Sequence, residues 1–181
     1  MRTDESILIE RILDGHDEDY GYFIERYGDE TLALVMRLVS SREDAEEIVQ
    51  DAFVSAFDHL CEFRGRSKFS TWLCSIAYRK ALSYLRQRKI KYVEINENTN
   101  VSDSDIDETL ADEQRTRQLQ RAVKMLKPEE QALITMFYYD NRHINDIALI
   151  IGQKPNNIAT RLHRIRKKLY LLIKENYEDG Q

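Results

Sequence analysis

Apolar residues recur along most of the chain at spacings of three and four positions, the period of an amphipathic α-helix. The pattern predicts helices over residues 5–13, 19–39, 42–60, 69–89, 109–125, 128–139, 144–151 and 155–175. Ser41 precedes an acidic first turn, as helix N-caps do. Pro128 and Pro155 suit first helical turns. With only six glycines and two prolines, turns are too scarce for a β architecture, so we expect an all-α fold.

The helical pattern stops between residues 92 and 108, a stretch rich in acidic residues, Asn and Ser and poor in apolar ones. Such a composition is typical of a flexible linker. We therefore expect two small helical domains, 1–91 and 109–181, joined by an acidic linker at 92–108.

Charge is distributed unevenly along these 181 residues, although the formal net charge is only −5. Residues 1–63 carry 17 acidic and 5 basic side chains, and residues 92–114 carry 8 acidic and no basic ones. By contrast, residues 64–91 carry 9 basic and no acidic side chains, and residues 115–174 carry 13 basic and 4 acidic ones. Two basic segments in an acidic chain indicate nucleic acid or an anionic membrane as the partner.

Several other classes of protein are excluded. No apolar run is long enough for a membrane span, and the first residues lack the features of a signal peptide. Cys61 and Cys74 match no disulfide framework or zinc motif, so we expect a reduced, cytoplasmic protein without metal or cofactor. A di-iron carboxylate site needs Glu-x-x-His, but Glu47 is followed three residues later by Gln50. No residue has a convincing catalytic partner, so we predict that the protein is not an enzyme.

The first basic segment combines cations with aromatic residues in a loop, 61–68, and on one face of the helix that follows it. Cations neutralise phosphates while unpaired bases stack on or between aromatic rings, so the pattern favours single-stranded nucleic acid. The alternative is a solvated cationic face, with Trp72 an ordinary core residue. The candidate DNA-binding residues are Phe63, Arg64, Arg66, Lys68, Thr71, Trp72, Ser75, Arg79, Arg86 and Lys89.

The second basic segment has the pattern of a helix-turn-helix: a helix at 144–151, Gly152, and a second helix from Pro155. Asn and Arg on the second helix are suited to base edges of duplex DNA. A helical hairpin with a basic exterior is the alternative, and His163 suits a DNA-binding or a structural role. The candidate residues are Asn156, Asn157, Thr160, Arg161, Arg164 and Lys168.

The helix after Ser41 has a polar, mainly acidic face, which would repel DNA. It is either a solvated face or a docking surface for a protein, with Val54 as an apolar anchor. The candidate protein-binding residues are Asp44, Glu46, Glu47, Gln50, Asp51 and Val54.

These motifs together resemble those of bacterial extracytoplasmic-function sigma factors, the small group 4 of the sigma-70 family of RNA polymerase sigma factors. Residues 44–53 (DAEEIVQDAF) look like the family's region 2.2, and residues 63–73 (FRGRSKFSTWL) look like regions 2.3 and 2.4. Residues 126–131 (LKPEEQ), 161–164 (RLHR) and 166–169 (RKKL) look like region 4. The resemblance covers nearly all of the chain except the linker.

The resemblance implies a mechanism. The region 2.2 helix would dock on the β′ clamp helices of core RNA polymerase, and the C-terminal domain would reach the β flap. The loop at 61–70 would capture a flipped base of the −10 promoter element, the basic helix face would hold the melted strand, and the helix-turn-helix would recognise the −35 element. An anti-sigma factor, often membrane-anchored in this family, would sequester the chain, with no direct membrane insertion.

Departures from the family pattern occur at Arg79 and Ser83, where the family often has Asn and Asp, and at Lys154–Asn157 in the helix-turn-helix. The promoter sequence therefore cannot be carried over. Two rival hypotheses are a duplex-binding regulator that uses only the C-terminal domain, and a helical protein-interaction module. The first leaves the aromatic and basic loop unexplained, and the second leaves both basic segments unexplained.

Overall fold

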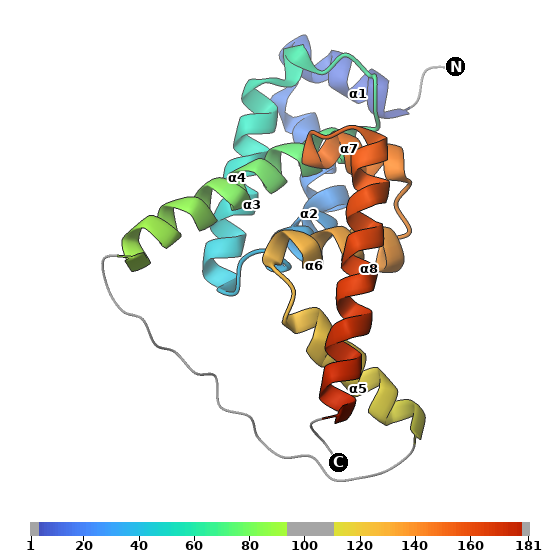
Figure 1. Cartoon of the computed structure of the whole chain (residues 1–181). Helices are drawn as coiled ribbons and strands as arrows, with labels where there is room; N and C mark the ends of the chain where they lie inside the picture. The colour runs from blue at the N-terminus through green and yellow to red at the C-terminus, as the bar shows by residue number, and fades with distance from the viewer. Residues whose placement is uncertain (1–3, 94–110, 179–181) are drawn as a thin grey trace.

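The computed structural model describes the backbone of residues 4–93 and 111–178 and the side chains of residues 4–88 and 118–173. All regular structure within these ranges is helical (Figure 1). The α-helices are α1 (Asp4–Leu13), α2 (Gly21–Met36), α3 (Arg42–Asp58), α4 (Phe69–Val93), α5 (Ala111–Lys124), α6 (Pro128–Ile134), α7 (Ile144–Ile151) and α8 (Pro155–Glu178). The predicted all-α fold is confirmed. The predicted linker lies, from residue 94 onward, outside the described residues.

Helices α1 to α4 form the N-terminal domain around an aromatic core. Phe23 of α2 and Phe69 of α4 are fully buried, with ring centroids 4.3 Å apart. The Ser41 hydroxyl accepts a hydrogen bond from the Asp44 amide at 3.2 Å, so the predicted N-cap of α3 is confirmed. Burial of one face of α3 against this core leaves its other face exposed.

The predicted helix 19–39 is shorter in the structure. A 3₁₀ turn, Asp17–Tyr20, leads into α2, which ends at Met36. Beyond Met36 the chain forms a tighter turn, in which the Leu38 amide donates a hydrogen bond to the Val35 carbonyl at 2.9 Å. Leu38 and Val39 are buried, so this tightening turns both side chains into the core instead of continuing the helix into solvent.

Helices α5 to α8 form the C-terminal domain, with Leu133, Ile147, Ile158 and Leu162 buried between them. The predicted helix 128–139 is α6 followed by a π-helical turn, Thr135–Tyr139. Helices α7 and α8 form the predicted helix-turn-helix. Gly152 between them has φ +74°, a left-handed conformation that closes α7 through bonds from the Gly152 and Gln153 amides to the Ala148 carbonyl.

The two domains contact each other, chiefly through α4 and α7 (Figure 1). Helix α4 is therefore sandwiched between the helices of its own domain and the C-terminal domain. In the part of the chain that is described, no helix is both long and apolar enough to cross a lipid bilayer.

Candidate functional site

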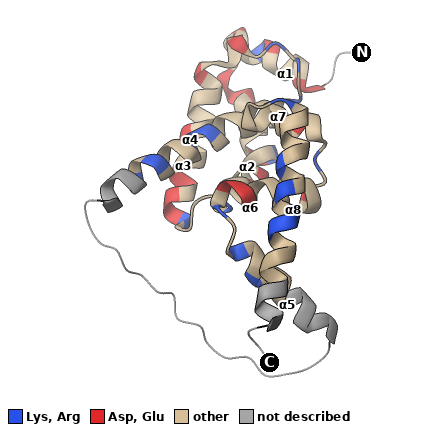
Figure 2. Ribbon diagram, in the orientation of Figure 1, with Lys and Arg blue, Asp and Glu red and all other residues tan. Residues whose placement is uncertain are grey.

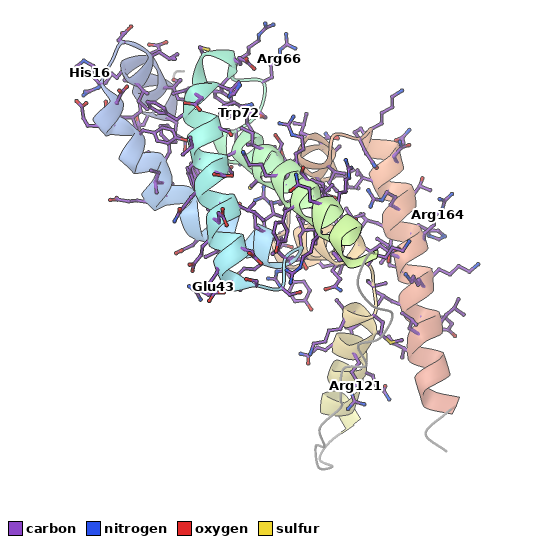
Figure 3. The ribbon with its side chains drawn as sticks, turned by 90° about the vertical axis from the view of Figure 1, so that its left-hand side faces the viewer. His16, Glu43, Arg66, Trp72, Arg121 and Arg164 are labelled. Atoms are coloured by element: carbon purple, nitrogen blue, oxygen red, sulfur yellow. The ribbon has the colours of Figure 1, made fainter. Side chains whose placement is uncertain are left out.

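The loop before α4 carries an aromatic cluster with cations beside it. The rings of Phe63 and Trp72 are 5.2 Å apart, and Trp72 is 5.7 Å from the buried ring of Phe69. Phe63 and Trp72 are only partly buried, so this cluster belongs to the core on one side and reaches the surface on the other. The neighbouring cations Arg64, Arg66 and Lys68 are exposed, and Figure 3 shows Arg66 near Trp72 at one end of α4.

The helical continuation of this region is less accessible than the sequence suggests. Thr71 and Ser75 are only 2% and 9% exposed. Arg79 is exposed but folds back along α4, where its Nε donates to the Ser75 carbonyl at 3.0 Å. Arg86 is exposed, and the side chain of Lys89 lies outside the described residues. We call the loop cations, the aromatic pair and this helical face, through Arg86, the α4 surface.

The second candidate surface lies at the start of α8, directly after the left-handed turn at Gly152. Asn156, Asn157, Thr160 and Arg164 are exposed, as a DNA-recognition helix requires. Figure 3 shows Arg164 on α8, in the other domain from Trp72. We call this set, with Arg161 and Lys168, the α8 surface.

Arg161 and Lys168 already have partners within the C-terminal domain. Arg161 is partly buried and donates to the Gln153 side chain at 3.3 Å, and Lys168 Nζ lies 2.8 Å from Glu130 Oε2. Burial raises the pKa of Glu130, but Lys168 and the Lys127 amide outweigh burial and hold that pKa below its ordinary value. Lys168 therefore ties α8 to α6, whatever its role toward DNA.

On the acidic face of α3, some side chains bind other residues of the chain and others are exposed to solvent. The Tyr84 hydroxyl donates to Asp44 at 2.5 Å and Arg88 lies 3.4 Å away, so this carboxylate ties α3 to α4. The Tyr84 bond, followed by the Ser41 bond, lowers the pKa of Asp44. Glu46 forms an i,i+4 pair with Arg42 at 2.8 Å. The remaining predicted docking residues, Glu47, Gln50, Asp51 and Val54, are exposed.

An apolar groove of about 740 Å³ runs between α2 and α3 beside this acidic face. Ile24 and Val54 line it and are 48% and 59% exposed. Gly28 also lines it, and a side chain added there would point into open space, so the absence of one keeps the groove open. The sequence predicted Val54 but not Ile24 or Gly28, because the groove depends on how two helices pair. In the sequence, only Ile24 could have been noticed, because it is an apolar residue outside the buried stripe of its helix.

Charge segregates between these surfaces. Figure 2 shows acidic residues concentrated on the helices of the N-terminal domain and basic ones along α8 and on α4. Nucleic acid is therefore favoured at α4 and α8 and disfavoured at α3. Among the described side chains, no three His, Cys, Asp or Glu residues are placed to hold a metal ion.

Family models match both halves of the chain. The model described as Sigma-70 region 2 matches residues 23–90, and the one described as Sigma-70, region 4 matches residues 116–169. The first segment contains the whole α4 surface and the groove helices from Phe23 onward, and the second contains the whole α8 surface. Together the matches cover more than half of the chain.

Similar proteins carry related names. The chain is 28% identical over 158 residues to the RNA polymerase sigma factor YlaC of Bacillus subtilis, which covers 85% of this chain and 91% of that protein. It is 29% identical over 179 residues to the ECF RNA polymerase sigma-E factor of Haemophilus influenzae, covering 92% and 93%. The sigma-E factor of Escherichia coli K12 is 27% identical over 176 residues, covering 91% and 92%.

Solved structures share the fold. The sigma factor RpoE from Bartonella quintana, in complex with the anti-sigma factor NepR, matches with a TM-score of 0.64 and 21% identity, over 87% of this chain and 98% of that chain. CnrH, in complex with the cytosolic domain of CnrY, matches with a TM-score of 0.65 and 20% identity, over 93% and 96%. With both family regions present in order and the helix-turn-helix in place, the chain belongs to the sigma-70 family and is an extracytoplasmic-function RNA polymerase sigma factor.

Proposed function

We propose that the three surfaces divide the work of a sigma factor: the α2–α3 groove docks on core RNA polymerase, the α4 surface captures the −10 strand, and the α8 surface recognises the −35 duplex. One observation carries the proposal. An aromatic and basic loop and a basic helix-turn-helix occur in one chain, together with an apolar groove beside an acidic helix face that DNA would avoid. The reaction chemistry belongs to the polymerase, so this chain acts by binding, in the cytoplasm, and not as an enzyme.

The groove suits a helical partner. Its floor is apolar, its rim holds Glu46 and Gln50, and Val54 is exposed at its edge. An amphipathic helix places apolar residues into such a groove and polar ones along its rim. The β′ clamp helices of the polymerase are the occupant that we propose, with the β flap as a second contact at the C-terminal domain.

The same groove offers a site for inhibition. The structurally similar sigma factor RpoE is solved with the anti-sigma factor NepR, and the structurally similar CnrH is solved with the cytosolic domain of CnrY. We propose that an anti-sigma factor, membrane-anchored or not, also binds this chain and competes with the polymerase.

The loop and the half-buried aromatic pair provide the −10 contact. A base that leaves the duplex costs a few kcal/mol in lost stacking and pairing. Stacking on Trp72 or Phe63 and phosphate contacts from Arg64, Arg66 and Lys68 offset that cost. Because the chain departs from the family's common residue at Arg79, the family's −10 sequence is not carried over to this protein.

At the other end of the promoter, the start of α8 provides the −35 contact. Asn156 and Asn157 are exposed at the start of the recognition helix, where base edges of a major groove are reached first. Arg164 lies two turns further along the helix and suits a base or a phosphate.

In vitro transcription with purified core polymerase and genomic DNA fragments tests the proposal. Promoter-specific transcripts that depend on this protein are the expected result. The rival, a duplex-binding regulator that does not act as a sigma subunit, predicts tight duplex binding by the protein alone and no such transcripts. Tight duplex binding without such transcripts would overturn the proposed division of surfaces.

Gly28 permits a sharper test of the groove. Gly28→Leu places a side chain in the groove, so affinity for core polymerase should fall by about tenfold or more. Gly28→Ala fills little space and serves as the matched control, with unchanged affinity expected. Equal binding by both variants, each shown by circular dichroism to be folded, would place the polymerase elsewhere.

A further inference from the structure

Arg142 of the C-terminal domain reaches into the N-terminal domain. Its guanidinium pairs with the carboxylate of Glu30 on α2 and lies 3.5 Å from the Cys74 sulfur on α4. The Arg142 side chain is only 10% exposed, and Cys74 is 1% exposed. This is a specific contact between the domains, because an arginine is rarely buried without a dedicated partner.

The backbone before α7 is shaped to place this arginine. The π-helical turn at 135–139 is followed by Asn141, whose φ of +48° is left-handed. The Arg142 amide then bonds back to the Met136 carbonyl at 2.9 Å. Asn tolerates the left-handed region better than most residues, and both features are uncommon in helical domains. The connection thus holds Arg142 in one position instead of leaving it on a loose loop.

The contact covers part of the α4 surface. Cys74 meets Arg142, while Tyr78 and Leu82 line a cleft with Ile151 at the end of α7. Thr71 and Ser75 lie on this same side of α4, one turn from Cys74 and Tyr78, and both are buried. Two of the α4 side chains proposed for the melted strand, Thr71 and Ser75, are therefore inaccessible in this arrangement, whereas Arg79 and Arg86 stay exposed.

The cleft also contains cations from both candidate surfaces. Arg86 of α4 lines it together with Arg161 and Arg164 of α8. Tyr78 and Arg161 line this cleft from the two domains; burial raises the pKa of Tyr78, and the guanidinium of Arg161 opposes that rise. The carboxylates facing these cations are Glu129 and Glu130, and Glu130 is already paired with Lys168.

We propose that the free protein is a closed, self-inhibited state in which the C-terminal domain covers the −10 face of α4, with Arg142 as the latch. The inference rests on the proposed function of the α4 surface. Opening exposes Thr71 and Ser75 and separates Arg86 from the two arginines of α8.

The latch is built to release. Glu30 is 46% exposed, so water competes for its carboxylate. The Nε of Arg142 is buried and has no hydrogen-bond partner among the described residues, which costs free energy in the closed state. The cations in the cleft repel each other when the domains meet. A partner that binds only the open form can therefore shift the equilibrium with a modest difference in affinity.

Cys74 provides a direct measurement of opening. In a Cys61→Ser background Cys74 is the only thiol, because the chain has two cysteines. We expect slow reaction of Cys74 with N-ethylmaleimide in the free protein. Arg142→Ala should accelerate labelling by about tenfold or more, the ratio expected when a charged hydrogen bond is lost from a contact.

Electrostatics alone would give the opposite sign. Burial raises the pKa of the Cys74 thiol to about 11, and Arg142 partly opposes this rise. Removing Arg142 without opening would raise that pKa further and slow the labelling, since the thiolate is the reactive form. Faster labelling of a variant with unchanged circular dichroism therefore reports domain separation.

Charge exchange and a matched control complete the design. Glu30→Arg should also accelerate labelling, and the double variant Glu30→Arg with Arg142→Glu should restore protection. Arg11→Ala removes an ion pair with Asp19 inside the N-terminal domain and should leave labelling unchanged. Equal labelling rates of Cys74 in the parent, Arg142→Ala and Glu30→Arg would overturn the latch, whether these rates are all slow or all fast.

Adding core polymerase links the latch to function. Docking should accelerate Cys74 labelling in the parent to the rate of Arg142→Ala. If the polymerase binds and Cys74 stays protected, opening is not coupled to docking and the inhibitory role is wrong. Labelling of the free protein needs neither polymerase nor DNA, so its result stands apart from the transcription test of the proposed function.

Discussion

The α4 and α8 surfaces look alike in sequence and differ in the folded chain. Both are helix faces rich in Arg and Lys and free of acidic residues. On α8 the polar residues at the start of the helix are exposed, whereas on α4 two of the corresponding polar residues, Thr71 and Ser75, are buried. The reason is position: α4 lies between two domains and α8 at the edge of one. A basic face in a sequence thus indicates a ligand, but only packing decides whether the ligand can reach it.

The largest expected effect sharpens this contrast at Trp72, which is the only tryptophan in the chain and half-buried in the aromatic cluster. If a −10 base stacks there, Trp72→Ala should reduce open-complex formation by about 3 kcal/mol, roughly a hundredfold. Transcription from a supercoiled promoter template measures this loss. Trp72→Phe keeps an aromatic ring and should retain most activity. Equal activity of Trp72→Ala and Trp72→Phe would make Trp72 a core residue only.

A smaller effect is expected at Arg161 on the α8 surface. If Arg161 contacts a guanine, Arg161→Ala should weaken binding by about 1–3 kcal/mol at one −35 position alone. Holoenzyme binding to a set of single-base −35 variants measures this specificity. Lys154→Ala, at the exposed turn before α8, is the comparison, with a uniform loss across sequences expected. A uniform loss for Arg161→Ala as well would make it a phosphate contact.

Two glycines test the backbone that supports each region. Gly152→Ala forces a side chain into a left-handed conformation and should cost about 1–2 kcal/mol of stability. Gly28→Ala, within α2, should instead stabilise by about 0.5–1 kcal/mol, because alanine favours a helix interior. Neither added carbon meets an atom within 4 Å, so the backbone alone determines the opposite signs. Urea unfolding measures both, and the same sign for both would contradict the turn geometry.

The smallest effect concerns the ion pair that ties α8 to α6. The pKa of Glu130 is lowered in the folded protein, so the pair stabilises above the ordinary carboxyl pKa and this stability is lost as pH falls. Glu130→Gln should therefore be less stable than the parent by about 0.5–1 kcal/mol at pH 7. The difference should shrink as pH falls through the lowered folded pKa of Glu130 and disappear well below it, where the parent carboxyl is also neutral. Thermal unfolding across this pH range measures it, and a difference independent of pH would mean that the charge of Glu130 does not matter.

Local patterns allowed much of the fold to be predicted. The Ser41 cap, helix α7 and the Gly152 turn are set by residues within a few positions of one another, and all three are confirmed. The end of α2 was predicted wrongly. The helix ends at Met36, and Leu38 and Val39 are buried in a core that also includes side chains from helices far away in the sequence.

Candidate sites were less predictable where they depend on helices that meet in space. The sequence identified Val54, but the groove also needs Ile24 and Gly28 from α2. Asp44 was predicted as a docking residue, and the structure adds that its carboxylate accepts a hydrogen bond from Tyr84, forty residues away. Arg142, Glu30 and Cys74 attracted no functional prediction, since nothing local marks any of them.

The sequence by itself determined the helices, the charge segregation and the sigma-70 family regions, because each depends on nearby residues or on their order. Only the tertiary structure decided which basic side chains are accessible, how α2 and α3 form a groove, and where Arg142 ends. The physical reason is that burial and ion pairing are properties of pairs of surfaces. The partner surface for each of these features lies dozens of residues away in the chain, where periodicity and local charge carry no information about it.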